Sequence, residues 1–104
     1  MLTKRALNEL LTSFKADLSA YGYVPETMIL YGSYAKGNVH KYSDVDLAVW
    51  SKQFSGNSFE DFENVKPVLK NYRQFHVKFY PKDADEDNFD PFIHEIKRTG
   101  IKIL

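Results

Sequence analysis

The sequence predicts an α/β or α+β fold, in which a sheet is covered by helices. Two observations carry this expectation. Apolar residues recur at helical spacing near the amino terminus, and three short apolar segments later in the chain are typical of strands. The 104 residues contain neither an internal repeat nor a linker rich in Pro, Gly or Ser, so we expect one domain over residues 1–104.

The first third of the chain predicts a helix followed by a buried strand. Apolar residues recur at helical spacing from Ala6 to Leu18. Thr3 is a candidate N-cap for this helix, and Gly22 supplies a stop. Residues 27–31 then form an apolar run that is too short for an independent helix, which is typical of a buried strand.

A helical turn, a loop and a second strand are expected next. Residues 33–36 can form one turn, and the polar residues 38–43 indicate a loop. Every second residue of 45–50 is apolar, which predicts a strand. Asp44 and Asp46 lie on the face opposite to those apolar residues.

The second half of the chain predicts two helices around a third strand. Ser58 with Asp61 resembles a capped helix start, and Pro67 should bend or interrupt this helix. Residues 75–80 alternate between an apolar and a polar face, which is typical of a strand. A last helix is expected over residues 91–99, because a proline opens this segment and a glycine follows it.

Two segments of the second half are less regular. Five acidic residues between Asp83 and Asp90 occur without a base, which most often indicates a solvated loop. Residues 101–104 can form either a short edge strand or a packed tail. Neither segment changes the predicted fold class.

Composition and charge exclude several classes of function. The chain has no cysteine, which excludes thiol catalysis and cysteine-based metal sites and is compatible with a reducing cytosol. Because 14 Lys and Arg residues balance 14 Asp and Glu residues, we expect no strong nucleic-acid binding. No apolar run approaches the ~20 residues of a membrane span, and the amino terminus lacks the apolar segment of a signal peptide. We therefore expect a cytoplasmic protein without membrane association.

The stretch over residues 32–49 combines features that suit phosphate and metal chemistry. A predicted strand ends in Gly32 and Ser33, where a glycine permits close approach of a ligand and free helix amides favour a phosphate. Asp44 and Asp46 stand two residues apart on a strand, so their carboxylates can converge on a hard cation. Either pattern alone most often marks a turn or the entrance of a strand, whereas the combination is more specific.

This stretch resembles the minimal nucleotidyltransferases of the DNA polymerase beta superfamily, whose signature is Gly-Ser, ten residues and Asp-X-Asp. Residues 31–37 and 43–49 are similar to the family pattern, and residues 93–101 to its carboxy-terminal helix and tail. The resemblance implies the nucleotidyltransferase fold, a small mixed β-sheet flanked by helices. It also implies transfer of a nucleoside monophosphate from a nucleoside triphosphate, with ATP expected, to an acceptor hydroxyl with release of pyrophosphate.

The resemblance also implies roles for individual residues. Asp44 and Asp46 would be catalytic and would bind Mg²⁺ or Mn²⁺, which neutralise the triphosphate and lower the pKa of the attacking hydroxyl. Gly32 and Ser33 would hold the β and γ phosphates. Lys36 could add a phosphate contact, although its residue type and position fit a solvated helix lysine equally well.

His76 stands where members of the family usually have a third carboxylate. The alternation of residues 75–80 turns it to the same side as Asp44 and Asp46, so it is a candidate catalytic residue. Three accounts remain open. His76 acts as a general base or binds a softer ion such as Mn²⁺ or Zn²⁺, an acid from residues 83–90 replaces the missing group, or the enzyme is degenerate.

A partner-binding role is the alternative that the resemblance leaves open. Many small members of the family occur beside a helical HEPN nuclease, which they bind and sometimes adenylylate on tyrosine. The chain would then be the antitoxin-type member of a HEPN toxin-antitoxin pair. A homodimer is also compatible with the sequence.

The tyrosine and histidine side chains near the motif are expected mainly to pack or to lie at the surface. Tyr31, Tyr34 and Tyr42 flank it and could stack on a base or sugar, but packing is the default for tyrosines in so small a domain. His40 and His94 are expected to be surface or packing residues rather than metal ligands.

Overall fold

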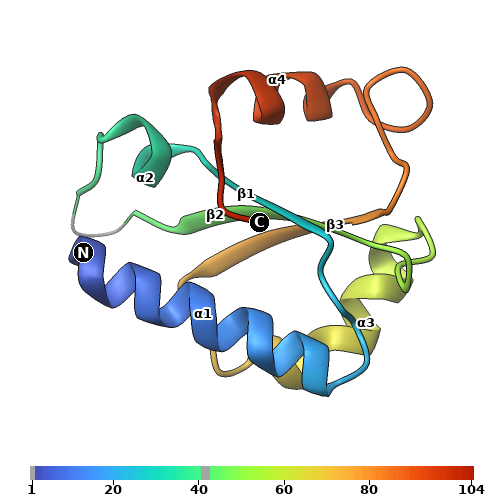
Figure 1. Cartoon of the computed structure of the whole chain (residues 1–104), viewed down its shortest axis with the longest axis horizontal. Coiled ribbons are helices and arrows are strands. Elements are labelled where there is room, and N and C mark those ends of the chain that lie inside the picture. Colours follow the sequence, from blue (N-terminus) through green and yellow to red (C-terminus); the bar gives the residue numbers. More distant parts are fainter. Residues whose placement is uncertain (1, 41–42) are drawn as a thin grey trace.

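A sheet between helices forms the centre of the computed structural model, which describes residues 2–40 and 43–104 (Figure 1). The elements are α1 (Lys4–Ala20), β1 (Thr27–Tyr31), α2 (Ser33–Lys36), β2 (Val45–Ser51), α3 (Ser58–Leu69), β3 (Phe75–Pro81), α4 (Phe92–Thr99) and β4 (Ile101–Lys102). This order and the three long strands agree with the sequence prediction. None of the helices in the described residues is long and apolar enough to cross a membrane.

The described strands form a mixed sheet with the order β3-β2-β1-β4. β1 runs antiparallel to both β2 and β4, whereas β2 and β3 are parallel. The parallel connection passes through α3, as parallel neighbours require. The predicted α/β fold with a small mixed sheet flanked by helices is therefore confirmed.

The first face of the sheet packs against α1 and α3 (Figure 1). Thr3 caps α1 as predicted, because its Oγ1 accepts a hydrogen bond of 3.1 Å from the Ala6 N–H. Apolar side chains from both helices and from alternate strand positions make up this core. Its buried members are Leu7, Leu11, Phe14, Leu18, Met28, Leu30, Val45, Leu47, Val49, Phe54, Val65, Val68, Tyr72 and Phe79.

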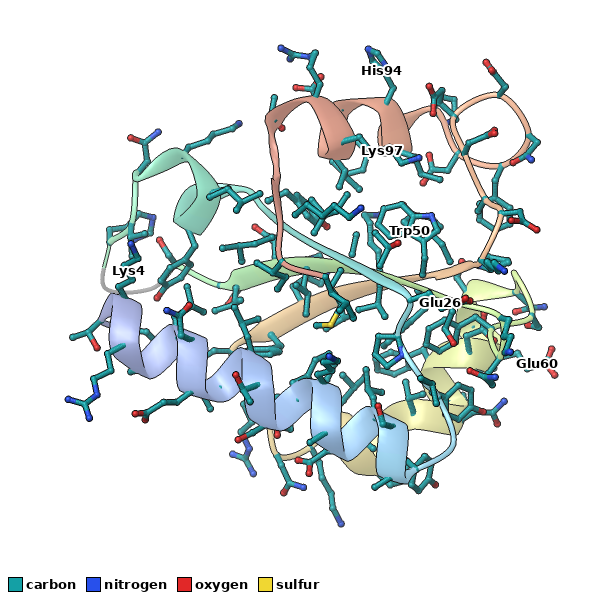
Figure 2. All side chains as sticks on the ribbon, viewed as in Figure 1. Lys4, Glu26, Trp50, Glu60, His94 and Lys97 are labelled. Atoms are coloured by element: carbon teal, nitrogen blue, oxygen red, sulfur yellow. The ribbon has the colours of Figure 1, made fainter. Side chains whose placement is uncertain are left out.

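The second face carries a separate apolar cluster beneath α4 (Figure 1). Ile93 and Ile96 of α4 are fully buried there with Trp50 and Tyr80. Figure 2 shows Trp50 between the sheet and α4, and its Nε1–H donates to the Ala84 carbonyl oxygen at 3.0 Å. The polar face predicted for β3 ends before Tyr80, which is buried in the same cluster as Ile93 and Ile96 of α4.

The start of α3 differs by one residue from the prediction. Asn57, not Ser58, is the N-cap, since its Oδ1 accepts from the Glu60 N–H at 3.0 Å. Asp61 is buried and instead binds the preceding loop, accepting hydrogen bonds from the Ser55 N–H and Oγ at 2.9 Å and from the Gly56 N–H at 3.1 Å. Asp61 thus fixes the loop to the helix.

Pro67 does not interrupt α3, which continues to Leu69. A proline inside a helix removes one N–H, which would here have bonded to the Glu63 carbonyl. Glu63 is exposed, so water can satisfy that carbonyl at little cost. Of the predicted bend or interruption, the interruption does not occur, because the proline falls in the last turn of the helix.

The acidic segment and the carboxyl terminus are both tied to the sheet. The loop over residues 83–90 is only partly solvated, because Ala84 is buried and the carboxylate of Asp90 accepts from the Tyr80 hydroxyl at 3.0 Å. β4 pairs with Ile29 and Leu30 of β1, so Ile101 and Lys102 form the edge strand, whereas Leu104 packs against the first core.

Candidate active site

The turn after β1 places a glycine directly beneath a carboxylate. Gly32 has φ 71° and ψ −148°, a conformation that is essentially restricted to glycine. A Cβ atom at this position would overlap Oδ2 of Asp46. Gly32 is therefore required twice, once by the backbone conformation and once by the packing of Asp46 against the main chain.

α2 is a single turn that begins immediately after Gly32. The Gly32 carbonyl oxygen accepts from the N–H groups of Ala35 and Lys36 at 3.1 and 3.0 Å. The amides of the first helical residues have no partner within the helix, so those of Ser33 and Tyr34 are available to an anion. Ser33 is half-buried at this end of the turn, and Lys36 is exposed at the other end.

Asp46 and His76 are brought together by the parallel pairing of β2 and β3. The two residues are register partners, and Asp46 Oδ1 lies 3.3 Å from His76 Nδ1. The Asp46 side chain is 25% exposed and that of His76 is 70% exposed, so both are open to solvent. The pair stands at the end of the sheet next to the Gly32 turn, within reach of a bound ligand.

Asp44 lies one residue before β2 and is exposed. In residues 2–40 and 43–104, no group of three or more His, Asp or Glu side chains is arranged to hold a metal ion. Mg²⁺ is commonly held in proteins by one or two carboxylates together with waters and substrate phosphates. The oxygen donors of Asp44 and Asp46 fit an ion of that kind, whereas the imidazole of His76 suits Mn²⁺ or Zn²⁺ better.

Tyr31 extends the Asp46–His76 pair into a row across the sheet, because it is the register partner of Asp46 on β1. Burial raises the pKa of Tyr31 to about 12, and the negative charges of Asp46 and Asp90 contribute to the rise. The fold therefore favours the protonated form of this phenol beside Asp46. The sequence marked Tyr31 as a neighbour of the motif but not as part of this row.

Tyr34 and Tyr42 do not extend the row. The hydroxyl of Tyr34 accepts a hydrogen bond of 3.0 Å from the Leu2 N–H. Its ring packs against the first core, which agrees with the expected packing role. Tyr42 lies outside the described residues. His40 is exposed, and His94 is exposed on α4 and points away from the sheet (Figure 2).

Lys78 and Phe92 border the site on the side of α4, and sequence reasoning missed both. The Lys78 Nζ atom lies 5.3 Å from the centroid of the Phe92 ring, which meets the Tyr31 ring edge-on at 5.9 Å. The available signal was the position of Lys78 two residues after His76, on the same face of a predicted strand. Nothing in the sequence indicated that Phe92 would reach it from α4.

The acidic segment does not supply a third carboxylate to the described site. Asp90 comes closest to the sheet, but its Oδ2 accepts from the Tyr80 hydroxyl and its Oδ1 from the Phe92 N–H, both at 3.0 Å. Asp90 therefore holds the start of α4 on β3. The account in which an acid from residues 83–90 replaces the missing group finds no support in the part of the chain that the structure describes.

The fold and this geometry define a class of protein: a small α/β domain in which the Gly-Ser turn before a short helix lies against a carboxylate at one end of a mixed sheet. The sequence profile of the nucleotidyltransferase domain family matches residues 7–103. The chain belongs to this family. No curated protein matches the chain in a sequence comparison.

Proposed function

We propose that the protein binds ATP together with Mg²⁺ or Mn²⁺ and transfers AMP to an acceptor hydroxyl with release of pyrophosphate. The observation that carries this proposal is the contact of the Asp46 carboxylate with the Gly32 main chain, at the start of α2. A carboxylate, which is the kind of side chain that binds divalent metals, therefore lies next to a glycine turn before a helix, which is the kind of backbone that binds phosphate. Membership of the nucleotidyltransferase domain family supports the same reaction class.

Different residues of the site would have different roles in this reaction. Asp44 and Asp46 would hold the divalent ion, which neutralises the triphosphate and acidifies the acceptor hydroxyl. Ser33 and the amides of α2 would bind the β and γ phosphates, and so hold the pyrophosphate leaving group in place. The backbone turn at Gly32 fixes these two sets of groups relative to each other.

In this proposal, His76 would accept the proton of the acceptor hydroxyl. Its Nδ1 faces Asp46, so a proton on that atom leaves Nε2 as an acceptor toward solvent. The acceptor oxygen forms a bond to the α phosphorus, and the bond between that phosphorus and the bridging oxygen breaks. The hydroxyl proton passes to His76 Nε2, and pyrophosphate leaves with the electron pair of the broken bond.

The test is metal-dependent ATP binding, measured by isothermal titration with Mn²⁺ and after its removal by chelation. We expect Asp46→Asn to abolish the metal-dependent part of the affinity, because the amide keeps the shape of the side chain but loses its charge. Asp87→Asn, on the exposed loop, makes the same chemical change and should bind ATP as the unmodified protein does. Equal, metal-dependent affinity in Asp46→Asn would overturn the proposal.

A second candidate function is binding of a HEPN protein as the antitoxin-type member of a pair. The observation that favours it is the exposure of three aromatic side chains, Phe59 at 75% together with Phe62 and Phe89. Phe62 and Phe89 line a groove of about 260 Å³ along β3. Exposed apolar groups of this kind commonly mark a partner surface.

This second function is tested by co-expression with a HEPN protein encoded by a neighbouring gene. We expect the two proteins to purify together, and Phe59→Ser to weaken the complex. A chain that stays monomeric and ignores that neighbour would remove the support for the partner model.

A further inference from the structure

Lys78 lies two residues after His76 on β3, next to the Asp46–His76 pair. Lys78 is the register partner of Ala48, as His76 is of Asp46. The Lys78–Ala48 pair and the His76–Asp46 pair are neighbours on the same face of the sheet, because side chains two residues apart on a strand point the same way. The side chain opposite Lys78 on β2 is that of Ala48, which is small and fully buried. It therefore does not separate Lys78 from Asp46.

The ammonium group of Lys78 has no carboxylate partner in the described part of the chain. None of the ion pairs formed there includes it. Asp90 and Lys78 line the same groove along β3. Both carboxylate oxygens of Asp90 already accept hydrogen bonds, from Tyr80 and from the main chain of Phe92. Lys78 is half-buried, and a cation in that setting is stabilised by an anionic ligand.

Phe92 holds this cation on the side of the site. Its ring lies 5.3 Å from Lys78 Nζ and edge-on to Tyr31, which is the β1 member of the row that contains Asp46. A cation over an aromatic face is weakly stabilised, which is enough to favour a position but not to replace an ion pair. The charge therefore remains available to a ligand.

We propose that Lys78 binds a phosphate oxygen of the nucleoside triphosphate at the Asp46–His76 site, an inference that rests on the proposed function. The described part of the chain brings no group of three or more His, Asp or Glu side chains together for a metal ion, so the site attracts less metal charge than a cluster of three carboxylates would. A lysine on the same face offsets this loss by neutralising part of the triphosphate directly. Lys78 is thus a ligand-binding residue outside the Gly-Ser and Asp-X-Asp motifs.

The experiment measures displacement of a fluorescent ATP analogue by ATP and by inorganic triphosphate, in the presence of Mn²⁺. We expect Lys78→Met to weaken both competitors by about tenfold or more, the equivalent of one charge-assisted hydrogen bond. Lys78→Arg should restore most of the affinity, since the charge returns. Lys102→Met, on the exposed strand β4 at the opposite edge of the sheet from β3, makes the same change and should leave both affinities unchanged.

The outcomes separate this inference from the proposed function. If the unmodified protein shows no metal-dependent ATP binding, the proposed function fails, and this inference with it. If the unmodified protein binds and Lys78→Met binds equally well, only the role of Lys78 is overturned. A loss of affinity that Lys78→Arg does not restore would indicate packing against Phe92, and would likewise overturn phosphate binding by this side chain.

Discussion

Two glycines on either side of α2 show how one residue type can have different roles in this protein. Gly32 and Gly37 both have positive φ, 71° and 77° respectively. A Cβ at Gly37 would meet nothing within 4 Å, whereas one at Gly32 would overlap the Asp46 carboxylate. Gly37 therefore serves only the end of the helical turn, and Gly32 also shapes the candidate active site.

This difference predicts different effects of adding one methyl group. We expect Gly32→Ala to cost about 1–3 kcal/mol of stability through backbone strain, and to reduce metal-dependent ATP binding by displacing Asp46. Gly37→Ala should cost about 1–2 kcal/mol and leave ATP affinity unchanged. Chemical denaturation and calorimetric titration of the two variants measure these effects. Equal ATP affinities in the two variants would contradict the role given to Gly32.

Residues at the site were predictable to the extent that they share a motif. The spacing of Gly32, Ser33, Asp44 and Asp46 is a property of the sequence. The approach of His76 to Asp46 followed from strand alternation once two strands were assumed to be neighbours. Lys78 was not identified, because the contact that positions it comes from α4, whose place over the sheet is not encoded by local spacing.

At the scale of elements, α3 depends on a buried acid that the sequence assigned to a helix cap. Asp61 accepts three hydrogen bonds from Ser55 and Gly56, and so joins the loop after β2 to the helix that leads to β3. Because α3 forms the crossover between the parallel strands, the loop and the pairing of β2 with β3 are connected.

We expect Asp61→Ala to lower the free energy of unfolding by about 3 kcal/mol, since it leaves several loop donors without an acceptor. Glu63→Ala, on the exposed side of the same helix, serves as the control and should change stability by less than about 0.5 kcal/mol. Urea denaturation of both variants provides the measurement. Similar midpoints for the two would show that Asp61 does not hold the loop.

At the scale of the whole molecule, tyrosines of the sheet and of the turn before β3 contact the segments that pack around them. Burial and the hydrogen bond to Asp17 raise the pKa of Tyr72 to about 12, and burial similarly raises the pKa of Tyr31 to about 12. Burial, with the bond to Asp90, also raises the pKa of Tyr80. In each case the folded protein favours the protonated phenol.

These shifts predict a loss of stability in alkali. Unfolded tyrosine titrates near pH 10.0, so above that pH the unfolded chain loses protons that folded Tyr72 retains until about pH 12. The contribution of the raised pKa is fully present below pH 10 and is lost as the pH rises to about 12. Tyr72→Phe should flatten this fall in the free energy of unfolding. Denaturation at several pH values tests it, and an unchanged slope would contradict the assignment.

The sequence by itself determined the kinds of elements, their order and the motif of the candidate site, because helical and strand periods and turn residues act over short stretches of chain. Only the tertiary structure decided which face α4 covers, why Trp50 and Tyr80 are buried, and which side chains border Asp46. Those features depend on contacts between segments far apart in the sequence. Their energies arise only when strand register and helix placement bring the partners together.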